Sequence, residues 1–471
     1  MNITINGRPV EAKEGERLLT VAQRHGIEIP HYCYHHKLST PANCRMCLVK
    51  VVDVPKLMPA CTVSVAANMK VETEAPEVMR ARQAVLQFQM LNHPVDCGIC
   101  DKAGECKLQD YQFAYGVPRS RSDEPKHHKR KLHDLSDRIQ LDNERCILCS
   151  RCVRFTREIS KSNALGIVDR GGHSYVERTG PDGLHDPYSD NVIGLCPTGA
   201  LLSRDFFYKS RTWYLEPVRS VCTGCARGCS VNVWRRKEQW RLRMFDDGKN
   251  VVYRITAYSN PDINGPWLCN KGFDLHKSMA RERALQPMLR GAPAPLDAAL
   301  AQAGVLLAEA KRPAAFASAQ ASNEELEALA SLAATVGERL TVYVREDCQP
   351  APGEVIEDDL LIKADKNPNS FTARQRFGTA GFAPGNGNHD VILLWGECQD
   401  YTRFGEATLI HLAPYATQGP RQPEVFIPLS TSFERSGTFC NFEGKVNRFE
   451  KVFDKPPGVQ HAQDVFARLV P

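Results

Sequence analysis

Eighteen cysteines stand out in this chain of 471 residues, because their number and spacing can support metal chemistry. Fifteen of them lie between Cys33 and Cys269, and many are only two or three residues apart. Such spacing lets one short loop turn two or three thiolates toward the same metal. Cysteines form disulfides mainly in secreted proteins, and the N-terminal residues lack the apolar core of an export signal. We therefore expect a reducing compartment and metal binding, with zinc and iron–sulfur clusters as the two candidates.

The first group of candidate ligands has ten, two and thirteen residues between its members, which are Cys33, Cys44, Cys47 and Cys61. The close pair Cys44 and Cys47 can hold one iron from a single turn, while flanking segments supply the other two thiolates. The arrangement resembles a plant-type [2Fe-2S] ferredoxin in which one loop is longer than usual. A structural zinc site is the alternative.

The second group combines three cysteines with a histidine in the segment HPVDCGICDKAGECKLQD, and its members are His93, Cys97, Cys100 and Cys106. No fourth cysteine lies nearby in the sequence, so His93 completes a site of four ligands. A lone histidine is more often a structural residue, and zinc also accepts three cysteines with one histidine. The spacing alone therefore leaves zinc open.

The third group is the bacterial ferredoxin run Cys146, Cys149 and Cys152, joined by Cys196 after an interval of 43 residues. Thiolates at every third position can occupy three corners of a cubane, and the turn Cys196-Pro197 can close the fourth corner. Zinc is the weaker alternative here.

The fourth group is Cys222, Cys225 and Cys229, joined by Cys269 after an interval of 39 residues. This interval is long enough for a small β-meander, which would return Cys269 to the other three cysteines. A vestigial or zinc-filled site is the alternative.

The overall composition is that of a globular protein of several domains. Hydrophobic residues make up 42% and charged residues 24%, and the net charge of +5 is too mild to favour nucleic acid binding. No apolar run approaches the roughly 20 residues that cross a bilayer, so we expect membrane contact only through partners. Three cysteines have no ligand spacing and are expected to be small buried hydrophobic residues: Cys348, Cys398 and Cys440.

Local patterns predict helices and strands around the cysteine groups. In the N-terminal part they are a β-hairpin at 3–10, a helix at 16–22, strands at 48–53 and 69–74, a helix at 76–92 and an exposed basic connection at 119–131. Beyond residue 280 the pattern is typical of α/β architecture. It predicts two helices within 295–337 around a break at Arg312-Pro313, and strands at 391–395, 407–412 and 425–429.

Taken together, these motifs resemble the family of large iron–sulfur subunits in the NADH-oxidising arm of respiratory complex I, which is NADH-quinone oxidoreductase. Mitochondria have a 75-kDa subunit of this family, and bacteria have a counterpart designated G. The resemblance covers residues 1 to about 275. It depends on the order of the four groups, on HPVDCGICDKAGECKLQD, and on the pair CILCSRC and GLCPTGAL.

The resemblance implies one [2Fe-2S] cluster at the first group and a [4Fe-4S] cluster at each of the second and third. The fourth group resembles an extra [4Fe-4S] site that some bacterial members keep. The implied fold is α+β and multidomain, with five parts. These are a β-grasp [2Fe-2S] ferredoxin-like domain at 1–77, a His/Cys3 domain at 78–118, a ferredoxin-like domain at 138–212, a cluster domain of the molybdopterin-oxidoreductase type at 215–271, and a shortened α/β scaffold at 272–471.

The C-terminal third departs from the family pattern. Residues 433–439 and 441–445 resemble a piece of a molybdopterin-oxidoreductase region that is usually much larger. About 200 residues are few for a pocket that holds two pterins, and no molybdenum ligand is evident, so no molybdopterin is expected. Cys440 lies between the two segments and is the residue to watch.

The resemblance implies electron relay, with no substrate-converting or catalytic residue in this chain. The implied partners are a flavoprotein that holds FMN and oxidises NADH, a small thioredoxin-like [2Fe-2S] subunit, and quinone-side [4Fe-4S] subunits. The complex would lie on the cytoplasmic face of the inner membrane and couple electron flow to proton translocation. NADH should bind elsewhere, because Gly171-Gly172 and the glycines of 381–387 do not follow a strand and open a helix.

Two other functions stay open at this point. A cluster subunit of a soluble NAD-linked hydrogenase or formate dehydrogenase would share the first three groups. A zinc-stabilised protein that binds RNA through the basic run KHHKRK is the remote alternative, although such runs are more often solvated loops.

Overall fold

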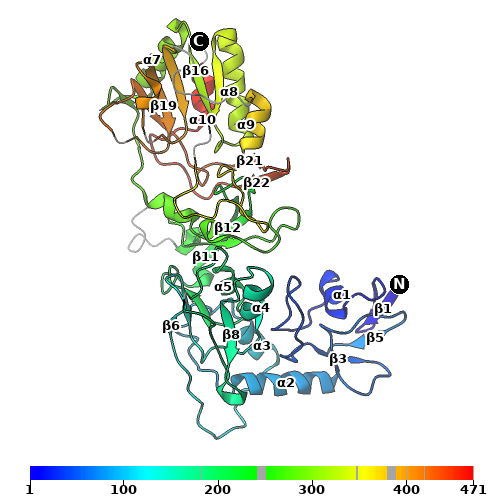
Figure 1. Cartoon of the computed structure of the whole chain (residues 1–471). Coiled ribbons are helices and arrows are strands. Elements are labelled where there is room, and N and C mark those ends of the chain that lie inside the picture. Colours follow the sequence, from blue (N-terminus) through cyan, green and yellow to red (C-terminus); the bar gives the residue numbers. More distant parts are fainter. Residues whose placement is uncertain are drawn as a thin grey trace. The chain divides into compact units, whose positions relative to one another are not determined.

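The computed structural model describes the chain except residues 182, 241–250, 346–347, 379–388, 399, 418 and 470–471, and it does not describe the side chains of 278–280. The described residues form two compact units, Met1–Leu215 and Glu216–Pro471 (Figure 1). The glycine stretch at 381–387 lies outside them. Among the described helices, none is long and apolar enough to span a membrane. The five domain boundaries within the two units remain predictions.

The first unit opens with a five-stranded sheet in the order β2-β1-β5-β3-β4, on which one helix packs. These elements are β1 (Asn2–Ile5), β2 (Arg8–Glu11), α1 (Leu18–Arg24), β3 (Leu48–Val51), β4 (Met58–Pro59) and β5 (Lys70–Glu72). The predicted hairpin is confirmed, because Asn6 and Gly7 have φ angles of 51° and 77°, as a type I′ turn requires. The helix predicted at 16–22 and the two predicted strands are confirmed with slightly different bounds.

Helix α2 (Pro76–Met90) confirms the helix predicted at 76–92, and α3 (Lys107–Tyr115) follows the second cysteine group. Pro76 lies in the first turn of α2, where a missing amide hydrogen removes no helical hydrogen bond. The helix buries Val78, Arg82 and Leu86, whereas Phe88 is 78% exposed. The apolar spacing thus identified the helix but not its buried face, because single apolar side chains also occur on protein surfaces.

The rest of the first unit contains a three-stranded sheet in the order β10-β7-β6 and a two-stranded sheet of β8 and β9. Its elements are β6 (His133–Asp134), β7 (Ile139–Leu141), α4 (Arg151–Glu158), β8 (Leu165–Val168), η1 (Gly171–His173), β9 (Tyr175–Arg178), α5 (Asn191–Leu195), β10 (Leu201–Ser203) and η2 (Thr212–Tyr214). The basic connection at 119–131 contains no helix or strand and is mostly exposed, as predicted.

The second unit begins with the three-stranded sheet β11-β12-β13, which confirms the predicted meander between Cys229 and Cys269. Its elements are β11 (Leu215–Val221), β12 (Ser230–Arg236), η3 (Glu238–Trp240) and β13 (Arg254–Ala257). Two short helices follow, α6 (Asn270–Phe273) and η4 (Leu275–Ala280).

A seven-stranded sheet forms the core of the second unit, in the order β15-β14-β20-β19-β18-β16-β17. The strands β17, β16, β18, β19 and β20 run parallel, and β14 is antiparallel to β20. The sheet strands are β14 (Met288–Leu289), β15 (Ala292–Pro293), β16 (Ala314–Ser318), β17 (Thr341–Arg345), β18 (Val391–Trp395), β19 (Thr408–Ala413) and β20 (Val425–Pro428). The predicted α/β architecture and its three predicted strands are confirmed.

Helices and short elements surround this sheet (Figure 1). They are α7 (Leu296–Glu309), α8 (Asn323–Val336), η5 (Gly337–Arg339), α9 (Ser370–Phe377), η6 (Thr402–Phe404), the paired strands β21 (Gly437–Cys440) and β22 (Val446–Phe449), and α10 (Ala462–Arg468). Helices α7, α8 and α10 share one hydrophobic cluster with the sheet.

The segment predicted as two helices around Arg312-Pro313 also contains strand β16, which the sequence analysis missed. Its residues, Ala-Ala-Phe-Ala-Ser, are typical of helices rather than strands, yet all five are buried between β17 and β18. Small side chains are suited to this position because both faces of a central parallel strand are covered. Tertiary packing therefore outweighed local propensity.

Helix α8 begins with a capping box that ties it to a buried ion pair. The Ser322 hydroxyl accepts a hydrogen bond from the Glu325 amide, and the Ser322 amide donates to the Glu325 carboxylate. That carboxylate also lies 2.9 Å from the Arg435 guanidinium. Loss of the cap would therefore disturb the helix start and the position of a buried charge.

We expect Ser322→Ala to lower the free energy of unfolding of the second unit by about 1 kcal/mol, the usual cost of losing an N-cap. The matched control is Ser331→Ala, on an exposed position of the same helix, which should leave that free energy within a few tenths of a kcal/mol. Tryptophan fluorescence during urea unfolding of the full chain measures the effect, since four of the five tryptophans lie in this unit. Equal effects of the two changes would contradict the role of the cap.

Candidate metal centres

The first cysteine group lies in loops at the edge of the N-terminal sheet. Cys44 and Cys47 come just before β3, Cys61 follows β4, and Cys33 lies in the loop after α1. All four are buried. Cys33 pairs with Cys44 and Cys47 with Cys61 by thiol hydrogen bonds, which lower the pKa of Cys44 and Cys61 and raise that of their donors. The structure therefore brings all four predicted ligands of this group into two contacting pairs.

Backbone amides surround the sulfur of Cys44. The Cys33 amide donates to Cys44 Sγ at 3.5 Å, and the amides of Tyr32 and Met46 also donate to it and lower its pKa. Arg45, between the two close cysteines, has a φ angle of 56°, a left-handed conformation that is uncommon outside glycine. Such turns point successive amides toward one centre, which suits a site that carries negative charge.

The second group lies between α2 and α3. Cys100 and Cys106 are buried, whereas Cys97 is exposed. Burial raises the pKa of Cys106 to about 11, and the nearby Cys100 raises it further. The Cys100 thiol is in turn influenced by Cys97. The three cysteines of the group thus lie in one neighbourhood.

His93 is the remaining predicted ligand of the second group. Burial lowers its pKa to about 4, and the charge of Arg145 lowers it further, as it also does for Cys100. Among the described residues, His93 Nδ1 is buried and has no hydrogen-bond partner. A neutral, buried imidazole with an unpaired nitrogen is suited to metal binding. Its role as a ligand nevertheless remains a proposal.

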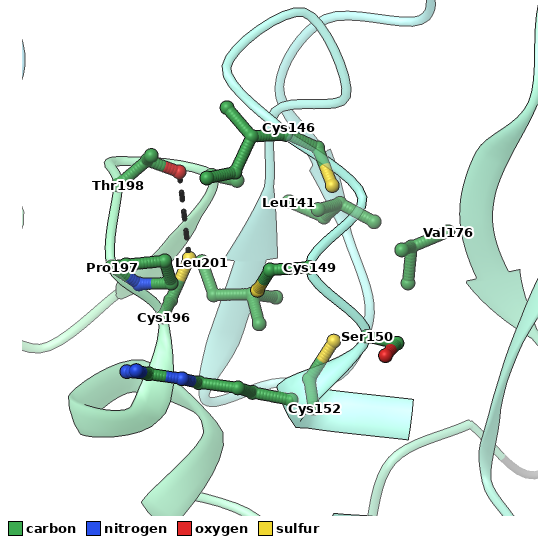
Figure 2. A pocket seen from close by; sticks show the side chains of 13 residues that line it. Leu141, Cys146, Cys149, Ser150, Cys152, Val176, Cys196, Pro197, Thr198 and Leu201 are labelled. Atoms are coloured by element: carbon green, nitrogen blue, oxygen red, sulfur yellow. Dashed lines mark hydrogen bonds between the residues drawn. The ribbon is translucent and has the colours of Figure 1, made fainter. Parts of the chain in front are cut away.

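The third group surrounds a hollow of about 370 Å³ that is partly open to solvent. Figure 2 shows the four sulfur atoms around this space, with three from the loop before and at the start of α4 and one from the turn after α5. Cys196 Sγ lies 3.7 Å from the Thr198 hydroxyl. The lining residues include all four members of the group, which are Cys146, Cys149, Cys152 and Cys196.

The loop of the third group repeats the backbone pattern of the first. Leu148 and Ser150 have φ angles of 54° and 60°, and the Leu148 amide donates to Cys146 Sγ at 3.4 Å. Burial raises the pKa of Cys149 to about 11 and that of Cys146 to about 12. These thiols would stay protonated at neutral pH unless a cation displaced the proton, as iron does when it binds sulfur. Donor chemistry and shape therefore fit a [4Fe-4S] cluster.

The fourth group lies in the second unit. Cys222 follows β11, Cys229 precedes β12, and Cys269 precedes α6. The Gly224 amide donates to Cys222 Sγ at 3.4 Å. Burial raises the pKa of Cys229, and the charges of the other three cysteines raise it further. The meander therefore returns Cys269 to its group, as the sequence analysis expected.

Ligand cysteines from the first three groups meet in one buried cluster of the first unit. The members of this shared cluster are Tyr32, Cys33, Cys44, Met46, Leu86, Cys106, Leu108, Tyr111 and Cys149. Arg154 on α4 joins the first group to the third, because its guanidinium donates to the carbonyl oxygens of Cys33, at 2.5 Å, and Cys149, at 3.5 Å. The ligand loops of the first and third groups are thus held against each other.

The second and third groups also touch. The Lys107 amide donates to the Pro197 carbonyl oxygen at 3.0 Å. Gly199 approaches so closely that a Cβ atom there would overlap Cys100 Sγ. The Cys196 thiol is near enough to Cys106 to raise its pKa. The third group therefore lies between the first and the second in space, an order that differs from the order in sequence.

A buried ion-pair network holds the loop between His93 and Cys97 in place. Asp96 lies 2.9 Å from Arg145 and 2.8 Å from Lys131, and Arg145 is only 2% exposed. Other side chains of the basic run also contact this chain: Lys126 caps the end of α2, and Lys129 donates to the Ser174 carbonyl oxygen. The run KHHKRK is therefore engaged in internal contacts, which speaks against the RNA-binding alternative.

The three spare cysteines differ from one another. Cys440 is buried, as expected, but Cys398 is partly exposed and Cys348 is exposed. The expectation of small buried hydrophobes was therefore wrong for Cys348, which lies in a loop outside the sheet rather than in a packed element. In the described parts of the chain, no three Cys, His, Asp or Glu side chains are placed to share a single metal ion.

Sequence reasoning missed three residues near the sulfur ligands: Tyr32, Arg145 and Arg154. Each is adjacent to a ligand cysteine or two residues away from it. The two arginines and the tyrosine are almost fully buried, although their types are usually at least partly exposed. Position next to the cysteines was the only available signal, and it does not distinguish a buried side chain from a solvated one.

Comparison with known proteins assigns four segments to iron–sulfur modules. Residues 1–76 match the 2Fe-2S iron-sulfur cluster binding domain, and 82–121 match the NADH-ubiquinone oxidoreductase-G iron-sulfur binding region. Residues 136–202 match the ferredoxin-like domain of NADH-quinone oxidoreductase subunit 3, and 215–281 match the molybdopterin oxidoreductase Fe4S4 domain. These matches and the mixed helices and sheets agree with an α+β multidomain fold.

A solved structure with local similarity is an NAD+-reducing [NiFe]-hydrogenase in the H2-reduced state. It is 26% identical, covers 44% of this chain and 89% of that chain, and has a TM-score of 0.40.

Whole-sequence relatives are similar over 62% of this chain. They include the NADH-ubiquinone oxidoreductase 75 kDa subunit of Reclinomonas americana, 36% identical over 292 residues, and the mitochondrial NADH dehydrogenase [ubiquinone] iron-sulfur protein 1 of Solanum tuberosum, 36% identical over 298 residues. The matched region spans only about two fifths of either relative, 40% and 38%. Over that region, this chain is a homologue of the 75 kDa iron–sulfur proteins of NADH-ubiquinone oxidoreductase and of their bacterial counterparts in NADH-quinone oxidoreductase.

Proposed function

We propose that this chain is an electron-relay subunit of NADH-quinone oxidoreductase, with one [2Fe-2S] cluster and three [4Fe-4S] clusters. The observation that carries the proposal is the shared buried cluster, where ligands of three separate groups meet. A chain that bound metals only for stability would have no need to place three ligand sets side by side. The names of the homologues agree with this role.

The ligand sets follow the four groups, with His93 as the single nitrogen ligand. Bound clusters supply one-electron chemistry, with potentials that depend on ligand charge, hydrogen bonds to sulfur and burial. The residues of this chain control those three properties. Amides of Met46, Leu148 and Gly224 donate to sulfur, and Arg145 and Arg154 place positive charge nearby. Neutral His93 removes one negative charge from its site.

The spatial order of the ligand groups suggests a direction of relay. The first group contacts the third through Arg154, and the third contacts the second through Pro197 and Gly199. Electrons that enter at the [2Fe-2S] site would therefore leave from the His93 site, where Cys97 is exposed. The proposed donor is an FMN flavoprotein that oxidises NADH, assisted by a small [2Fe-2S] subunit. The proposed acceptors are quinone-side [4Fe-4S] subunits of the membrane complex.

The fourth group has a different setting, because its loop is attached to the α/β region of the second unit. The Ala226 amide donates to the Asp365 carbonyl oxygen at 2.8 Å, and the Phe442 amide donates to the Ala226 carbonyl oxygen at 3.0 Å. Asn447 donates to the Gly228 carbonyl oxygen at 3.0 Å. A cluster here would therefore join the meander to the sheet domain, and we propose a role in folding rather than in the main electron path.

We expect the anaerobically reconstituted chain to hold about 14 iron atoms, as one [2Fe-2S] and three [4Fe-4S] clusters require. NADH should reduce these clusters only after the FMN flavoprotein partner is added, because no NADH site is proposed in this chain. Iron and zinc analysis with EPR during the addition measures both results. A protein that held mainly zinc would contradict the proposal, and about 10 iron atoms would mean that the fourth site is empty.

Replacement of the nitrogen ligand tests the second group. We expect His93→Ala to remove or strongly weaken one [4Fe-4S] EPR signal and to leave the other clusters intact. His93→Cys should retain a cluster whose potential is more negative, because a thiolate adds negative charge. The control is His128→Ala, since that side chain is exposed and pairs with Glu144 instead. If every signal survived His93→Ala at full intensity, His93 would not be a ligand.

The fourth site is tested by stability and turnover together. The double change Cys222→Ser and Cys225→Ser should lower the thermal stability of the second unit and weaken assembly, since metal binding can contribute on the order of 10 kcal/mol to folding. Turnover from NADH to quinone per assembled complex should stay nearly normal. The matched control changes Cys348 and Cys398 to Ser, outside any ligand group, and should alter neither quantity. Normal assembly with lost turnover would place the fourth cluster on the electron path.

A further inference from the structure

Tyr32 occupies a singular position in the shared buried cluster. Its side chain is completely buried, and among the described residues its hydroxyl has no hydrogen-bond partner. A buried hydroxyl without a partner destabilises a protein by about 1–3 kcal/mol, and native structures leave few such groups unpaired. The surroundings are apolar side chains and sulfur atoms of ligand cysteines. The missing acceptor therefore has to be sought at the metal sites.

The two ends of Tyr32 face different ligand groups. Its backbone amide donates to Cys44 Sγ, in the first group. Burial raises the pKa of its phenol, and the ionisable groups that add to this rise are led by Tyr111 and Cys106, followed by Cys44. The hydroxyl is therefore closer in effect to the second group than to the first.

The acceptor capacity of the two sulfur atoms points the same way. Cys44 Sγ already accepts from the amides of Cys33, Tyr32 and Met46 and from the Cys33 thiol. Cys106 Sγ accepts from two amides, those of Leu108 and Gln109, at the start of α3. Tyr111 does not compete as a partner for Tyr32, since the ring centroids are 5.3 Å apart and its hydroxyl accepts from the His31 amide at 3.3 Å.

We propose that the Tyr32 hydroxyl donates a hydrogen bond to a sulfur atom of the cluster held by His93, Cys97, Cys100 and Cys106, at or beside Cys106 Sγ. Tyr32 is then a positioning and tuning residue that links the first ligand loop to the second cluster. A hydrogen bond to sulfur stabilises the reduced, more negative cluster and raises its potential. This inference rests on the proposed function, because it requires a cluster in the second group.

The test is a redox titration of the reconstituted full chain, followed by EPR. The cluster of the second group is recognised by the nitrogen coupling of its histidine ligand. Tyr32→Phe should shift the potential of that cluster to more negative values and remove one coupling to an exchangeable deuteron in D2O. The [2Fe-2S] cluster and the other [4Fe-4S] clusters should keep their potentials. Tyr111→Phe is the matched control, a buried hydroxyl of the same cluster, and should leave the potential of the histidine-ligated cluster unchanged.

A second measurement avoids dependence on one variant. Fluorinated tyrosine is a more acidic phenol and a stronger donor, so its incorporation into the Tyr111→Phe chain should shift the same potential to more positive values. An unchanged potential in both experiments, or a shift confined to the [2Fe-2S] cluster, would overturn the assignment of Tyr32. A wild-type chain that binds no cluster in the second group would instead contradict the proposed function.

Discussion

A thiolate that is removed from water raises the free energy of a protein unless cations or hydrogen-bond donors lie beside it. The first unit places most of its candidate ligands in this situation. Burial raises the pKa of Cys106 and Cys149 to about 11 and that of Cys146 to about 12. These cysteines are suited to a state in which iron replaces the thiol protons, and the rest of the unit is arranged to support that state.

That support comes from the backbone and from buried arginines. Arg45, Leu148 and Ser150 have positive φ angles, which cost energy for residues other than glycine. Strained conformations of this kind persist where surrounding structure holds them, and here they aim amides at sulfur. Arg154 joins the first and third ligand loops, while Arg145 lies between the second and third. The same side chains therefore neutralise charge and fix the spacing of the groups.

The second unit solves a different problem with different means. Its parallel sheet is buried on both faces and is stabilised by apolar packing against α7, α8 and α10. The fourth ligand loop contributes little apolar area of its own and is attached to this domain through backbone hydrogen bonds of Ala226 and Gly228. A stable sheet can hold a small loop in register, and a bound cluster can in turn hold the loop to the sheet.

The sequence by itself determined the four ligand groups, because Cys-x2-Cys spacing is a local property that a short loop must obey. It also determined the hairpin at Asn6-Gly7 and strand β18, where turn chemistry and an unbroken apolar run leave few alternatives. Only the tertiary structure decided that β16 is a strand, that Cys348 is exposed, and that the third group lies between the first and second. It also decided that Tyr32, Arg145 and Arg154 are buried beside sulfur. Each of these outcomes depends on contacts between residues far apart in the chain, and local patterns carry no information about which distant surfaces will meet.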